Sequence, residues 1–436
     1  MANLGGGMGT AMDKVSTRSV KAQSSERSWA PRMWIGSDFF AWLRIMVRGR
    51  FQFNLPHIYI GVCTSFITFI HTVLKVAQNA LYSKQIRSTK IDKAPIFIVG
   101  HWRTGTTLLH ELMITDERHN YPNTYQCYEP NHFLLTEDLT KKFLWFLLPE
   151  RRPMDNMHVG WDRPQEDEFA LCMMGQPSPY LDIIFPNRPS MTPGALDLEG
   201  LSPRQRRSWK QAFYSLIQAL TFRDDRRLVL KSPPHSCRIK TLLEVFPDAR
   251  FVHIVRNPYD VFPSTVKLWK SLAEKHGVQT PHHRGVEERV FETLPHLYRK
   301  LEEGKKLLGP SQFHELRYED LVADPVGEMR LLYDKLELGE FDSLKPRLEE
   351  YLAKNRNYEP NKFELSAEKR DEISKRWGNV IRHYGYSIES DETDAEEPSI
   401  LPFPTLHTPV AADADAESDA AVEVAHAAGA RVASGS

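Results

Sequence analysis

The sequence predicts an α/β fold in which a central parallel sheet is flanked by helices and carries a helical insertion. Two strand–turn–helix units support this prediction, one starting near Ile96 and the other near Arg227. The second unit is followed by a further strand near Arg250, and this spacing is typical of parallel strands joined by a right-handed connection. The chain has 436 residues, 41% of them hydrophobic, which is enough for one large domain or for two.

The first unit contains a loop suited to binding phosphate. The apolar run Ile96–Val99 lies between Pro95 and Gly100, which indicates a buried strand. A turn of small and hydroxyl-bearing residues follows at Arg103–Thr107, and Leu108–Met113 continues with helical spacing. Such a turn at a helix N-terminus directs backbone N–H groups and the positive end of the helix dipole at an anion. The predicted fold is therefore P-loop-like.

The loop nevertheless differs from a Walker A loop, which reads Gly-x-x-x-x-Gly-Lys-[Ser/Thr]. Here Arg103 precedes Gly105, and no lysine follows the glycine. The lysine and the metal-binding serine of a nucleoside triphosphatase are missing, which disfavours hydrolysis of a metal–nucleotide complex. Tight strand-to-helix turns also occur for packing alone, but a run this dense in Gly, Thr and Arg favours binding.

The second unit places more cations at the same edge of the sheet. A strand at Arg227–Lys231 ends in a polar turn, the helix-like stretch Ile239–Phe246 follows, and the next strand lies within Ala249–Val255. Ligands of such sheets bind outside the carboxyl ends of the strands. Three strand-end cations are therefore expected to converge: Arg103, Lys231 and Arg256.

These residues resemble the sulfotransferases that use 3′-phosphoadenosine 5′-phosphosulfate, of the bacterial type related to the tyrosylprotein and carbohydrate enzymes. In that family an Arg/Lys-x-Gly-Thr-Thr loop binds the 5′-phosphosulfate, and an arginine with a serine eight residues later binds the 3′-phosphate. The segment Leu316–Leu321 resembles a further family element, and the resemblance covers roughly residues 91–386. It implies these donor-binding residues: Arg103, Thr104, Gly105, Thr106, Thr107, Leu108, Arg256 and Ser264.

The resemblance also implies catalytic residues for in-line sulfuryl transfer to an acceptor hydroxyl or amine, a reaction that can proceed without metal. Arg103 is expected on the leaving-group side, and Lys231 matches a lysine that contacts the transferring sulfuryl group. Glu129 occupies a position comparable to that of the glutamate base in the tyrosylprotein enzymes. The alternative interpretation is that Glu129 is an ordinary carboxylate at the end of a strand. The rival bases are His235 and the acidic cluster Glu166-Asp167-Glu168, which is typical of a helix N-terminus.

The rest of the chain divides by composition. Residues 1–30 and the acidic, Ala-rich tail 389–436 are predicted to be disordered. Residues 31–90 are predicted to be helical, and 91–388 form the predicted sulfotransferase domain. Within that domain, 141–230 is expected to form a helical lid over the acceptor site, with strand-like character only at Tyr180–Phe185.

Charge, cysteines and hydropathy limit the partners and the compartment. The net charge is −1, but without 389–436 there are 55 basic and 46 acidic residues, and this basic body suits an anionic nucleotide. No basic tract interleaved with aromatics suggests nucleic-acid binding. Four scattered cysteines, with no Cys-x-x-Cys pair or signal peptide, predict a cytoplasmic protein without a metal site: Cys63, Cys127, Cys172 and Cys237.

The uncharged run Ile58–Ile70 allows two interpretations. His71 and Lys75 interrupt its continuation, so a core helix is favoured over a spanning one, while a peripheral membrane contact stays open. Two other functions also stay open. A small-molecule kinase would share the phosphate loop but should need Mg²⁺ and ATP, and a non-catalytic nucleotide-binding protein would not need Lys231 or Glu129. The acceptor itself is not predicted.

Overall fold

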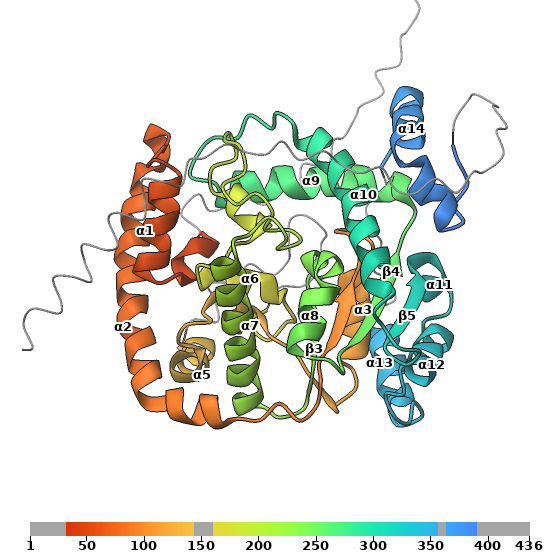
Figure 1. Ribbon diagram of the computed structural model, residues 1–436, viewed down its shortest axis with the longest axis horizontal. Coiled ribbons are helices and arrows are strands. Elements are labelled where there is room, and N and C mark those ends of the chain that lie inside the picture. Colours follow the sequence, from red (N-terminus) through yellow and green to blue (C-terminus); the bar gives the residue numbers. More distant parts are fainter. Residues whose placement is uncertain (1–31, 144–159, 356–362, 390–436) are drawn as a thin grey trace, which may run out of the picture.

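The computed structural model describes residues 32–143, 160–355 and 363–389, which form a parallel sheet with helices on both faces (Figure 1). The predictions for residues 1–30 and for the tail beyond Glu389 fall outside the described residues. The strand order is β2-β3-β1-β4-β5, and every pairing is parallel. The strands are β1 Ile96–Val99, β2 His119–Asn120, β3 Arg227–Lys231, β4 Arg250–Val255 and β5 Phe313–Arg317.

The central position of β1 brings the three predicted cationic turns to one edge. Ile98 of β1 is in register with Lys231 at the end of β3, and Val99 with His253 near the end of β4. The turns that leave β1, β3 and β4 therefore lie side by side at the carboxyl end of the sheet. This confirms the predicted α/β fold with a central parallel sheet.

The two faces of the sheet are covered by different helices, because alternate residues of a strand point to opposite faces. Ile96 and Ile98 pack with α3 and α11–α13, whereas Phe97 and Val99 pack with helices that include α7–α10 and α14. The elements of the first group are α3 Thr106–Met113, α11 Tyr318–Ala323, α12 Pro325–Lys335 and α13 Lys345–Lys354. Those of the second are α7 Pro203–Arg223, α8 Ile239–Val245, α9 Pro258–His276, α10 Val286–Lys305 and α14 Ala367–His383.

Shorter helices lie before and within the predicted insertion 141–230. They are α4 Thr124–Tyr128, α5 Phe133–Phe143, α6 Asp167–Met173 and a 3-10 helix at Pro179–Ile183. The strand-like interpretation of Tyr180–Phe185 is wrong. Ser178 accepts a hydrogen bond from the Tyr180 N–H, and Pro179 presets the helical φ, so the chain turns instead of extending.

The N-terminal region consists of a 3-10 helix at Met33–Gly36, the helix α1 Phe39–Arg48, a 3-10 turn at Leu55–His57 and the long helix α2 Ile58–Ser88. In Figure 1, α1 and α2 lie at one side of the molecule, where α2 packs next to α5 and α7. An ion pair joins Asp38 to Lys75 at 2.7 Å. The Trp42 indole N–H donates to the Ser65 hydroxyl at 2.9 Å.

The polarity of α2 is the reverse of that in an ordinary surface helix. Ile60 and Ile86 are buried near its ends, but between them its buried residues are small or polar, Gly61, Thr64, Thr68 and Gln78. Most of its large apolar residues are exposed: Tyr59, Val62, Phe66, Phe69, Ile70, Val73, Val76 and Leu81. Within the described residues, Leu55–Ser88 is long and apolar enough to cross a membrane by length and composition, and 22% of its most apolar window is buried. The favoured interpretation of 58–75 as a core helix is therefore wrong.

Candidate active site

The loop after β1 has the backbone shape of an anion cradle. Gly100 has φ +149° and Gly105 has φ +101°, and a Cβ on Gly100 would lie 2.6 Å from the Ile254 carbonyl oxygen, so only glycine fits there. Arg103 also has a positive φ of 72°, a strain that is commonly found at functional sites. Gly105 caps α3 without a side-chain cap, so the first N–H groups of the helix stay available to an anion.

The predicted residues of this loop have different surroundings. Thr104 is buried and its hydroxyl donates to the His101 carbonyl at 2.8 Å, so its side chain stabilises the turn. Thr106 lies in the first turn of α3 with only 5% of its surface exposed, and Thr107 is half-buried. Leu108 packs its side chain against the core, and it is the third residue of α3, where a backbone N–H lies within the first turn of the helix.

The two predicted halves of the donor site meet in the structure. The Arg103 Nε donates to the Ser264 Oγ at 2.8 Å, across 161 residues of sequence. The Gly100 N–H donates to the Ser236 Oγ at 2.8 Å, which ties the same loop to the turn after β3. Arg103 at the β1 turn and Ser264 on α9 are therefore close enough to bind one ligand.

Arg256 follows β4, and its guanidinium lies over the Tyr318 ring at 4.4 Å from the ring centre. It also contacts Asp260 at 3.4 Å. The Arg256 Nε is buried without a hydrogen-bond partner among the described residues, and a buried donor in this state favours an anionic ligand. The residues present therefore fit a nucleotide with phosphates at both ends of the site.

Lys231 ends β3 and is only 3% exposed. Its Nζ donates to the Glu166 Oε1 at 2.8 Å, and the Tyr180 hydroxyl donates to the other oxygen of Glu166. The Trp102 Nε1 in turn donates to the Tyr180 hydroxyl at 2.8 Å. This chain of contacts joins the end of β3, the start of α6 and the loop after β1.

Glu166 is the accessible member of the acidic cluster, with 13% of its side chain exposed. Asp167 accepts from the Ser232 hydroxyl at 2.9 Å and pairs with His235 at 2.6 Å, and both partners are fully buried. Burial acts to raise the pKa of Asp167, but His235 and these hydrogen bonds lower it overall. Glu168 forms two contacts with the buried Arg238, at 2.5 and 3.1 Å.

Glu129 lies at the C-terminal end of α4 and makes different contacts. Its Oε2 lies 3.1 Å from the His71 Nδ1 on α2 and 3.1 Å from the His132 Nε2 just before α5. Its carboxylate is 12% exposed. Glu166 therefore lies beside Lys231, and Glu129 lies beside two histidines.

Four aromatic side chains form a group beside Glu166: Trp102, Phe169, Tyr180 and Trp269. Phe169 stacks on Tyr180 with ring centres 4.6 Å apart, and Trp102 lies 5.3 Å from Trp269. Sequence reasoning did not identify Phe169, Tyr180 or Trp269 as site residues, because their contacts depend on how the insertion packs against the rest of the chain. His101 is buried beside them, and burial lowers its pKa to about 4.

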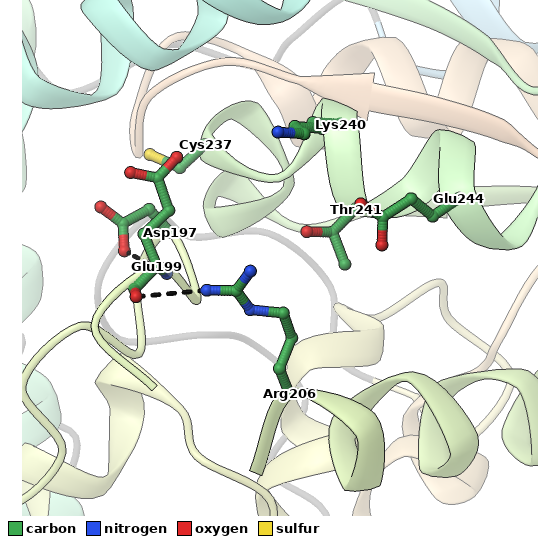
Figure 2. A pocket seen from close by; sticks show the side chains of 7 residues that line it. All are labelled: Asp197, Glu199, Arg206, Cys237, Lys240, Thr241 and Glu244. Atoms are coloured by element: carbon green, nitrogen blue, oxygen red, sulfur yellow. Dashed lines mark hydrogen bonds between the residues drawn. The ribbon is translucent and has the colours of Figure 1, made fainter. Parts of the chain in front are cut away.

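A separate polar pocket of about 210 Å³ lies between the segment before α7 and the start of α8 (Figure 2). The Arg206 guanidinium donates to the Glu199 carbonyl at 3.2 Å in its wall. The residues that line it are Asp197, Glu199, Arg206, Cys237, Lys240, Thr241 and Glu244. None of these is a predicted donor-binding or catalytic residue, so the pocket is not part of the candidate active site.

Comparison with known proteins identifies the family, because the profile of the Sulfotransferase family matches residues 95–343. This chain belongs to the sulfotransferase family. The matched segment contains every predicted donor-binding and catalytic residue. The chain is therefore a sulfotransferase, and the donor that the family implies is 3′-phosphoadenosine 5′-phosphosulfate.

Relatives and solved structures agree with this assignment. The omega-hydroxy-beta-dihydromenaquinone-9 sulfotransferases Stf3 of Mycobacterium bovis and Mycobacterium tuberculosis are each 45% identical over 383 residues, which is 88% of this chain and 98% of theirs. Sulfotransferase STF9 of Mycobacterium avium has a TM-score of 0.59 at 18% identity, covering 78% of this chain and 88% of its own. Sulfotransferase STF1 of Mycobacterium tuberculosis has a TM-score of 0.52 at 18% identity, covering 77% and 90%. The two solved structures show the same fold.

Proposed function

We propose that the loop after β1 and the start of α9 bind the two ends of the sulfuryl donor. The backbone N–H groups at the start of α3 and the Arg103 guanidinium would bind the 5′-phosphosulfate. Arg256 and Ser264 would bind the 3′-phosphate. The observation that supports this most directly is the 2.8 Å hydrogen bond from Arg103 to Ser264, which joins the two predicted subsites.

Lys231 would stabilise the charge on the transferring sulfuryl group, and a carboxylate would accept the proton of the acceptor hydroxyl. The sequence predicted Glu129 as that base, but the contacts favour Glu166. Glu166 lies 2.8 Å from Lys231 and is partly exposed, whereas Asp167 and His235 are buried in a pair of their own. Donor binding would draw Lys231 toward the sulfuryl group and leave Glu166 free to accept a proton.

The acceptor would be the hydroxyl of a lipid-soluble molecule, presented at a membrane surface on the cytoplasmic side. The 45% identical relatives are named for a hydroxylated dihydromenaquinone. The exposed apolar face of α2 continues onto α1 through Phe40, Leu43 and Val47, which gives a surface suited to lipid. The aromatic group beside Glu166 would hold the apolar part of the acceptor next to the catalytic residues.

The proposed residues can be tested by transfer of labelled sulfate to a hydroxylated quinone in detergent micelles. Glu166→Gln should lower turnover at least 100-fold while Glu129→Gln keeps near-normal turnover, and affinity for 3′-phosphoadenosine 5′-phosphate should change little in both. The reverse result would return the role of base to Glu129. Strict dependence on Mg²⁺ and ATP would favour the kinase interpretation.

A further inference from the structure

Three side chains from three separate segments converge outside the donor site. His71 lies in the middle of α2, Glu129 ends α4, and His132 precedes α5. One ligand atom from each lies within 4.8 Å of the others. The Glu129 Oε2 is 3.1 Å from the His71 Nδ1 and 3.1 Å from the His132 Nε2, yet neither contact has hydrogen-bond geometry, and all three atoms are buried without a hydrogen-bond partner among the described residues.

The hydrogen bonds around His132 show which of its nitrogens carries the proton. Its Nδ1 lies 2.9 Å from the Thr136 Oγ1, and that hydroxyl donates its own proton to the His132 carbonyl at 3.0 Å. The Tyr125 hydroxyl also donates to the Thr136 Oγ1, at 2.8 Å. Thr136 therefore accepts from the Nδ1–H of His132, which leaves a lone pair on Nε2 facing the carboxylate.

His71 is arranged in the same way. Its Nδ1 is likewise buried without a hydrogen-bond partner among the described residues, as expected for the tautomer that carries its proton on Nε2. The Nδ1 of His71 then also presents a lone pair to Glu129. Two nitrogen lone pairs and one carboxylate oxygen in van der Waals contact repel one another unless a cation lies between them.

We propose that His71, Glu129 and His132 bind a divalent transition metal of the Zn²⁺ type. Zinc–nitrogen and zinc–oxygen bonds of about 2.0–2.1 Å at tetrahedral angles separate neighbouring ligand atoms by about 3.3 Å. The two measured separations of 3.1 Å are close to this value and are explained by one ion that all three groups coordinate. Two imidazoles and one carboxylate are a zinc ligand set, with the fourth position left for water.

The metal would join α2 to the body of the protein. Around His71 the buried residues of α2 are polar, Thr64, Thr68 and Gln78, so apolar packing contributes little to its attachment there. A bond from His71 to an ion that Glu129 and His132 also bind would fix the middle of this helix against the segment between α4 and α5. The ion would contact none of the proposed donor-binding or catalytic residues, so the site can be tested whether or not the proposed function holds.

The experiment uses the full-length protein, stripped with a chelator and titrated with Co²⁺. The expected result is one Co²⁺ per chain, with the intense visible absorption of tetrahedral cobalt, and a melting temperature that rises on reloading with Zn²⁺. His71→Ala and His132→Ala should each weaken Co²⁺ binding more than about 100-fold. His296→Ala is the matched control, because His296 pairs with Asp197 at 3.0 Å in an ordinary hydrogen bond, and it should leave Co²⁺ binding unchanged.

If a histidine variant does not fold, Glu129→Gln provides the same comparison with both imidazoles in place. It should lower Co²⁺ affinity and shift the visible spectrum. The proposal would be overturned if the stripped wild-type protein gave no tetrahedral cobalt spectrum. It would also be overturned if that spectrum survived both histidine substitutions. In either case the cluster is held by a protonated histidine instead of a metal.

Discussion

Glu166→Gln should destabilise the protein in the absence of donor, because it removes the counter-charge of a buried lysine. The Lys231 side chain is 3% exposed and that of Glu166 is 13% exposed. Removing one partner of a buried ion pair costs about 3–5 kcal/mol, and the lower value applies here because glutamine can still accept a hydrogen bond. A folded body of more than 300 residues unfolds with an entropy of about 0.7 kcal/mol/K, so about 3 kcal/mol corresponds to a fall of about 4 °C in Tm.

The assay is thermal unfolding of the purified protein, with and without 3′-phosphoadenosine 5′-phosphosulfate. The donor should raise the Tm of Glu166→Gln more than that of the wild type, because its sulfate replaces the missing charge next to Lys231. The double variant Glu166→Gln/Lys231→Met should regain part of the lost stability, because it no longer buries an unpaired charge.

A surface ion pair supplies the control. Glu199 is 57% exposed and pairs with Lys300 at 2.7 Å, so Glu199→Gln should change the unfolding free energy by less than about 1 kcal/mol. Equal Tm values for Glu166→Gln and the wild type would refute the reasoning, because they would show that Lys231 does not depend on Glu166. If Glu199→Gln lowered the Tm as much as Glu166→Gln does, the loss of stability would not be specific to a buried ion pair.

Three further predictions concern the donor, acid stability and the membrane. Arg256→Ala should reduce the preference for 3′-phosphoadenosine 5′-phosphate over adenosine monophosphate by roughly 10-fold or more in calorimetry, and an unchanged preference would place the 3′-phosphate elsewhere. Burial lowers the pKa of His101 from an ordinary 6.5 to about 4, so stability is highest above pH 6.5 and falls as the pH drops toward 4. In urea unfolding, the free energy of unfolding of His101→Asn should fall less between pH 6.5 and 4 than that of the wild type, by about 3 kcal/mol in total. An equal fall in the two proteins would contradict the burial argument. Phe66→Ser/Phe69→Ser should reduce vesicle binding at least 10-fold at constant Tm, while the equally exposed Val322→Ser on α11 should not.

The carboxyl edge of the sheet explains why the family could be predicted from the sequence. The strands Ile96–Val99 and Arg227–Lys231 lie where they were predicted, because each is an apolar run bounded by residues that break strands. The helix expected from Leu108 begins two residues earlier, at Thr106, and the helix at Ile239 begins where it was predicted. Parallel strands place their C-terminal turns together, so spacing alone indicated that Arg103, Lys231 and Arg256 would be neighbours.

The carboxylate that lies beside Lys231 could not be predicted in this way. Glu166 contacts Lys231, which is 65 residues away in the sequence. Tyr180 contacts Glu166 from a 3-10 helix that was predicted to be a strand. Both contacts depend on how the insertion folds back over the sheet. A single-sequence pattern records local preference, whereas these contacts are decided by packing between distant segments.

The sequence by itself thus determined the parallel sheet and the common edge at which Arg103, Lys231 and Arg256 follow their strands, because short-range spacing and strand direction decide these features. The place of Ser264 in the expected donor site was implied by the family resemblance and not by spacing. Only the tertiary structure decided the direction in which α2 faces. Its apolar run predicted a core helix, but Thr64 and Thr68 turn inward and Phe66 and Phe69 turn outward. The same rotation brings His71 to Glu129 and His132. Periodicity shows that a helix has two faces, but only the neighbours of the helix determine which of them is buried.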